Sequence, residues 1–177
     1  MVIYGFHPEE SLAEEIGKNL AERNLEGVEA IKFRPKLMPD NLHHLPEEIR
    51  VRITLDGIKE LKRYIKENYN RVGFILDLHE YPLIIQNQEQ FSLGFPAWNF
   101  RLEKALENFA KEYKKTFGEI EVIGSIPKGH PTYNSAAIEY CSKVKKHDNV
   151  VTLTKIEGEK FALSLIDYLK KNYLCKS

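Results

Sequence analysis

Two histidines and one glutamate are the side chains of this 177-residue chain best suited to metal chemistry. His7 and Glu10 stand three positions apart, directly after the apolar segment Val2–Phe6. His79 directly follows a second apolar segment, Val72–Leu78. Two imidazoles and a carboxylate form a ligand set that binds zinc in catalytic sites and leaves one position open for water. His7, Glu10 and His79 are therefore predicted to bind one zinc ion.

Each member of this set also has a simpler interpretation. His7 precedes Pro8, and the pair suits an ordinary surface turn. Glu10 suits the first turn of a helix, where a carboxylate contributes at most about 1 kcal/mol to stability. The joint placement favours the metal site, because both histidines follow apolar strands at positions where polar side chains are exposed and free to do chemistry.

A parallel sheet would bring the two segments together, because the carboxyl ends of neighbouring parallel strands meet at one edge. The run Val72–Leu76, which leads into Asp77–His79, is apolar throughout, as expected for a strand covered on both faces. Predicted strands and helices alternate along the chain, which indicates an α/β fold. We expect a single domain over residues 1–177, with a mixed, mostly parallel sheet sandwiched between helices. The expected helices are Ser11–Asn24, Leu55–Asn70, Trp98–Phe117 and Glu157–Tyr173, the other expected strands are Gly27–Phe33, Glu121–Ile126, Ala136–Ser142 and Val150–Thr154, and Arg34–Glu48 is expected to be a loop.

A second carboxylate, Glu139, lies inside the predicted strand Ala136–Ser142. On one face of that strand it has Ala137 and Cys141 as neighbours, so burial would raise its pKa. A carboxylate with a raised pKa can take a proton from water and return it to a leaving amine. The alternative is an edge strand with this face in solvent.

Three segments resemble the zinc carboxypeptidase superfamily, in particular the branch containing succinylglutamate desuccinylase and aspartoacylase. Residues 2–10 are similar to the strand-Gly-x-His-x-x-Glu opening of that branch, Asp77–His79 matches its Asp-Leu-His, and Ala137–Glu139 resembles its late catalytic strand. The resemblance implies a zinc carboxypeptidase-like fold, zinc ligands in the first two segments and Glu139 as the general base. It spans residues 2 to 141, which is most of the chain.

The chain departs from this branch in its arginines. The branch carries an oxyanion arginine and an Asn-Arg pair between its two zinc segments, whereas the Asn-Arg pair here, Asn70–Arg71, directly precedes the second strand. Arg50 is our first candidate for the oxyanion role, and Arg52 and Arg34 are further candidates for substrate binding. The alternative for Arg50 and Arg52 is a solvated pair at a strand edge.

Other polar residues stand near the predicted site. Asp77 suits a hydrogen bond that orients a ligand histidine, although aspartate at a strand end also forms turns. Glu80 replaces the small hydroxyl residue usual in the branch, which would make the site more acidic. The pair His43–His44 suits either a second metal or an exposed loop. Residues in the Gly- and Pro-containing segment before Glu139 are candidates for substrate binding, and these are Lys128, His130 and Tyr133.

The amino-acid composition limits which classes of partner the chain is expected to bind. The chain has 26 Lys plus Arg and 26 Asp plus Glu, so no overall basic field attracts nucleic acid. The mean hydropathy is −0.43, and no apolar run reaches the roughly 20 residues that span a bilayer. Two distant cysteines and no signal-like segment favour a cytoplasmic location.

Two functions remain open at this point. The first is a zinc-dependent hydrolase that cleaves an amide bond of a small N-acyl amino acid or peptide with metal-activated water. The second is a catalytically inactive metal-binding relative that serves as a binding or regulatory module, which the missing Asn-Arg pair favours. A nucleotide-binding protein without metal is disfavoured, because no Gly-rich phosphate loop follows any predicted strand.

Overall fold

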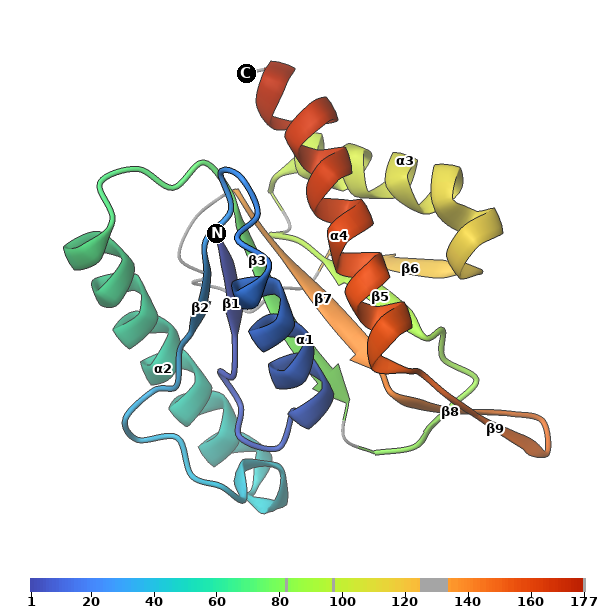
Figure 1. The fold of residues 1–177 in the computed structure, drawn as a ribbon. Coiled ribbons are helices and arrows are strands. Elements are labelled where there is room, and N and C mark those ends of the chain that lie inside the picture. Colours follow the sequence, from blue (N-terminus) through green and yellow to red (C-terminus); the bar gives the residue numbers. More distant parts are fainter. Residues whose placement is uncertain (82, 97, 125–133, 177) are drawn as a thin grey trace.

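The computed structural model describes residues 1–81, 83–96, 98–124 and 134–176. Its centre is a six-stranded sheet in the order β2-β1-β3-β7-β5-β6 (Figure 1). Strands β2, β1, β3 and β7 are parallel, β5 is antiparallel to β7, and β6 is parallel to β5. The predicted mixed, mostly parallel sheet is confirmed. The strands are β1 (Val2–Tyr4), β2 (Ala30–Lys32), β3 (Ile75–Tyr81), β5 (Phe91–Gly94), β6 (Ile120–Ile123) and β7 (Ser135–Cys141).

Helices cover both faces of this sheet and form two apolar cores. Helices α1 (Ser11–Glu22), α3 (Phe100–Phe117) and α4 (Lys155–Asn172) pack on one face. Helix α2 (Glu47–Asn68) packs on the other face, with Ile58, Leu61 and Ile65 against strand residues of β1 and β3. The arrangement in Figure 1 is therefore a sheet sandwiched between helices, as the alternating pattern predicts.

Helix α2 begins eight residues earlier than predicted, at Glu47 rather than at Leu55. Pro46 occupies its N-cap position, where the missing N–H of proline does no harm, and Glu47 and Glu48 suit the positive end of the helix dipole. The prediction was wrong because it treated this proline as a loop residue. Most of the preceding segment is irregular as expected, with one short 3₁₀ turn at Leu42–His44.

A small second sheet lies beside the main one. It has the order β4-β8-β9, with β4 (Ile85–Gln86), β8 (Lys143–Lys146) and β9 (Asn149–Thr152). Strands β4, β5 and β8 were not predicted. They are two to four residues long and contain only one or two apolar residues each, which is too few for a strand periodicity to be recognised.

Candidate metal centre

The turn between β1 and α1 carries two of the predicted ligands. Gly5 has a φ of 73°, a conformation that suits glycine, and it redirects the chain after β1. His7 follows in the turn, and Glu10 occupies the N-cap position of α1. The carboxylate of Glu80 accepts a hydrogen bond of 2.6 Å from the backbone N–H of Leu12 in the first turn of α1. Glu80 thus satisfies a free N–H group at this helix end and holds the turn against β3.

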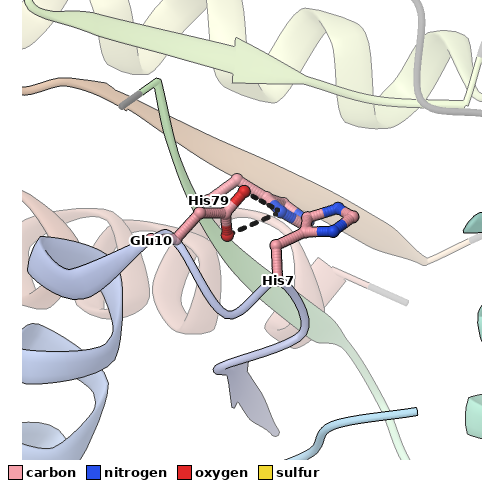
Figure 2. A group of neighbouring side chains, drawn as sticks. All are labelled: His7, Glu10 and His79. Carbon is pink, nitrogen blue, oxygen red and sulfur yellow. Dashed lines mark hydrogen bonds and ion pairs between the residues drawn. The ribbon is translucent and has the colours of Figure 1, made fainter. Parts of the chain in front are cut away.

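His79 comes from within β3, which pairs in parallel with both β1 and β7. It lies on the same face of the sheet as Asp77, two residues before it. The ligand atoms of His7, Glu10 and His79 all lie within 4.8 Å of one another. Figure 2 shows the two ligands of the turn meeting the ring of His79. The structure therefore brings the three predicted ligands together.

Both nitrogens of His79 face a carboxylate. Nδ1 lies 3.2 Å from Oε2 and 3.4 Å from Oε1 of Glu10 (Figure 2). On the other side of the ring, Nε2 lies 3.0 Å from Oδ2 of Asp77. This leaves Nδ1 as the nitrogen directed at the ligand cluster, with Nε2 held by Asp77 as expected of a residue that orients a ligand histidine.

The donor set fits a zinc ion. Two atoms bound to one zinc at about 2.1 Å are at most about 4.2 Å apart, so the three groups need at most a small inward movement. The buried Nδ1 atom of His7 has no hydrogen-bond partner among the described residues, and an unpaired buried nitrogen costs free energy unless something binds it. A metal ion or the water around it would satisfy the polar atoms of this cluster.

Burial and charge shift the protonation of all three groups. Burial and the nearby His79 lower the pKa of His7 to about 3, which keeps its imidazole neutral. Burial raises the pKa of Glu10 to about 7 against the opposing effect of His79. For His79, burial lowers the pKa, but the carboxylates of Asp77 and Glu10 outweigh it and raise the pKa well above 6.5. These shifts favour a protonated His79 in the metal-free protein, with one ring N–H facing Glu10 and the other facing Asp77.

Glu139 lies next to this cluster. In the parallel pair of β3 and β7 it is directly opposite His79, and together with Ala137 it lines the pocket that contains the three ligands. Burial raises its pKa, although His79 opposes the shift. The face of β7 that carries Ala137 and Glu139 therefore borders a pocket. The alternative of an edge strand does not hold, because β7 lies between β3 and β5.

The arginines predicted to bind the oxyanion or the substrate do not line this pocket. Arg50 and Arg52 are on α2 and not at a strand edge. Arg50 lines a neighbouring hollow that shares Thr54 with the pocket containing the three predicted ligands, and its side chain is outside the lining of that pocket. Arg52 and Arg34 are exposed, and Arg34 forms an ion pair with Asp40. Lys128, His130 and Tyr133 lie outside the described residues.

Further residues that the sequence analysis did not assign to the pocket also line it. His43, from the loop before α2, lines the pocket, and its Nε2 lies 3.6 Å from Oε2 of Glu9. Ile58 and Leu61 of α2 also line it. Their helical spacing indicates a buried face, but spacing alone does not reveal that part of this face borders a cavity.

No family model and no curated protein matches the sequence. Comparison with solved structures does find similar folds. The CwlD amidase from Clostridioides difficile, solved in complex with the GerS lipoprotein, has a TM-score of 0.54 at 12% identity, over 90% of this chain and 82% of that one. A point mutant of murine aminoacylase 3 has a TM-score of 0.50 at 13% identity, over 96% of this chain and 62% of that one.

Both similar structures belong to proteins that are named for acting on acylated amines, an amidase and an aminoacylase. At these identities the similarity defines the fold of this chain and nothing finer. The chain spans less than two thirds of the length of the aminoacylase chain. Among the described residues, no helix is long and apolar enough to cross a membrane.

Proposed function

We propose that this protein is a zinc-dependent hydrolase that cleaves an amide bond in a small N-acyl amino acid or peptide. The observation that carries the proposal is the meeting of His7, Glu10 and His79 within 4.8 Å, with Glu139 opposite His79 in the next strand. The similar folds of an amidase and an aminoacylase support the same class of reaction. The proposal also places the chain in the zinc carboxypeptidase superfamily.

Each residue of the site has a separate role in the proposed reaction. His7, Glu10 and His79 hold the zinc, which when bound lowers the pKa of a water molecule to about 7 and polarises a carbonyl group. Asp77 accepts a hydrogen bond from Nε2 of His79 and fixes the orientation of its ring. Glu139 accepts the proton of the attacking water on its carboxylate and then donates it to the amine that leaves. The raised pKa of Glu139 suits both halves of this proton transfer.

Replacement of Glu139 tests the proposal. The Glu139→Gln variant is expected to keep its zinc and to lose hydrolysis of N-acyl amino acids and short peptides by a factor of about a hundred or more, because an amide cannot accept the proton. Zinc content is measured by elemental analysis and hydrolysis by the release of free amine. Glu119→Gln, at an exposed position between α3 and β6, is the matched control and should retain full activity.

A metal-binding module without catalysis is the second candidate. The observation that favours it is the absence of lysine and arginine among the described residues that line the pocket, since a developing oxyanion needs a stabilising positive charge. If the unmodified protein binds one zinc but hydrolyses none of these amides, this second function replaces the first.

A further inference from the structure

The pocket beside the three ligands has one apolar side. Phe6, Ile58 and Leu61 lie next to one another in the α2-side core, with exposed fractions of 2%, 6% and 0%. Ile123 of β6 and Ala137 of β7 continue this apolar lining. A group bound against these residues would gain free energy from burial of its own apolar surface.

The remaining polar lining of the pocket is acidic. Glu10, Asp77 and Glu139 are largely buried carboxyl groups that line it. Among the described lining residues the basic side chains are three histidines, of which His79 is already held between two carboxylates. A carboxylate brought into this pocket would lose its hydration and find no arginine or lysine among these residues to replace it, which is a costly arrangement.

The size of the pocket limits what can bind beside a metal ion. Its volume is about 210 Å³, and an apolar protein cavity of about 150 Å³ is large enough to bind benzene. After a metal ion and its water are accommodated, the remaining space suits a short acyl group. Thr54 of α2, which is half-buried, also lines the pocket.

We propose that this pocket is a subsite for a small acyl group without a carboxylate and that it discriminates against acidic acyl groups such as succinyl. This assignment of the substrate class rests on the proposed amide hydrolysis. It predicts that specificity depends on the charge at the α2 side of the pocket, so a cation placed at Thr54 should change which acyl group binds.

Hydroxamates test the proposal without relying on turnover, because they bind zinc through two oxygens and present an acyl group to the pocket. The zinc-loaded protein should bind acetohydroxamate about tenfold more tightly than succinic monohydroxamate, measured by calorimetry. Equal or tighter binding of the succinic compound overturns the assigned acyl class. Failure of both compounds to bind, or failure to load zinc, instead contradicts the proposed function.

Two arginine variants of α2 sharpen this measurement. Thr54→Arg places a positive charge at the pocket, and it should improve binding of succinic monohydroxamate about threefold to tenfold relative to acetohydroxamate. Val51→Arg adds the same charge to the same helix at a residue that is 50% exposed and lines only the neighbouring hollow. This control should leave the ratio unchanged, and an equal effect of the two variants contradicts the proposal.

A cysteine-modification experiment gives a readout that needs no metal. Thr54→Cys and Val51→Cys are made in a Cys175→Ser background, since Cys175 is exposed and Cys141 is buried. Both new thiols lie within one helical turn of Arg50, so its charge acts on both. We expect a negatively charged methanethiosulfonate to react about threefold more slowly at position 54 than at position 51, after each rate is divided by that of the neutral methyl reagent. Equal ratios, or a faster anionic reaction at position 54, overturn the proposal.

Discussion

At the scale of single residues, the arrangement around His79 decides whether the cluster can bind metal. Its ring is held from both sides, by Glu10 at Nδ1 and by Asp77 at Nε2. A ring fixed in this way offers one nitrogen to a metal without having to give up rotational freedom at the moment of binding. In the proposed metal site, the carboxylate of Asp77 would also compensate the positive charge that the histidine acquires through the metal.

Replacement of Asp77 tests this orienting role. Asp77→Asn is expected to weaken zinc binding about tenfold to a hundredfold, because the amide is a poorer acceptor for the N–H of His79. Zinc affinity is measured by competition with a chelator. Asp56→Asn on the exposed surface of α2 is the matched control and should bind zinc as the unmodified protein does. Unchanged affinity in Asp77→Asn would show that the contact with His79 does not support the metal.

Zinc binding should depend on pH in a defined direction. In the metal-free protein the pKa of His79 is raised well above 6.5 and that of Glu10 is raised to about 7, so zinc must displace protons from these groups. Zinc affinity is therefore low at low pH and increases as the pH rises through these pKa values. Between about pH 6 and about pH 8 we expect an increase of at least about tenfold. Chelator competition at each pH measures it, and calorimetry in two buffers should detect proton release. An affinity that is flat over this range contradicts the assignment.

The residue types, their placement after apolar strands and the resemblance to the zinc carboxypeptidase superfamily together selected the three ligands that the structure brings together. Glu139 was selected through the resemblance, because the strand pattern alone left its role open, and the structure places it opposite His79. The same reasoning was not sufficient for the cations. Arg50 was selected by its distance along the chain from Glu10, but its position depends on where α2 begins, and one helical turn separates it from the pocket residue Thr54. Separation along the sequence does not determine the direction of a side chain on a helix.

At the scale of elements, helix α1 positions the turn that carries His7 and Glu10. The close approach of α1 to β1 depends on Gly17. A Cβ atom at Gly17 would lie 2.1 Å from Cγ of Tyr4, and a Cβ atom at Gly158 would lie 2.5 Å from Cδ1 of Ile16. The first contact is with a ring atom close to the backbone of β1, which cannot move away without shifting the strand. The second is with the end of a flexible side chain.

These contacts predict unequal costs for two alanine substitutions. Gly17→Ala should lower the free energy of unfolding by about 1–3 kcal/mol or more, through overpacking of α1 on β1, and it should also weaken zinc binding because Glu10 shifts with the helix. Gly158→Ala should cost less and leave zinc affinity unchanged. Urea denaturation and chelator competition measure the two effects. A larger cost for Gly158→Ala would show that α1 tolerates displacement from β1.

Long apolar or amphipathic segments were predicted well because each carries many positions of one periodicity. The helices α1, α3 and α4 begin and end within two residues of their expected limits. Strand β5 was missed although Phe91 and Leu93 are almost fully buried, because its four residues precede Pro96 and alternate too briefly to indicate a strand. Its antiparallel pairing with β7 makes the sheet mixed, and that pairing is a tertiary contact which no local pattern reveals.

At the scale of the whole molecule, the proposed metal site joins parts of the chain that are distant in sequence. Glu10 and His79 are 69 positions apart, and the unfolded chain cannot present these ligands in one place without a large loss of entropy. Zinc should therefore bind the folded state far more tightly than the unfolded state. A ligand with this preference stabilises the fold in proportion to the logarithm of its concentration over Kd.

Zinc is accordingly expected to raise the thermal stability of the whole protein. At a free zinc concentration of about a hundred times Kd, the stabilisation is about 2.7 kcal/mol. For a chain of this length each kcal/mol shifts Tm by about 2–4 °C, so calorimetric scans should show an increase of about 5–11 °C. His79→Ala should abolish the shift, whereas His44→Ala, an exposed histidine outside the pocket lining, should retain it. If both variants respond to zinc as the unmodified protein does, the ion binds elsewhere. The proposal that a metal links β3 to the turn before α1 is then wrong.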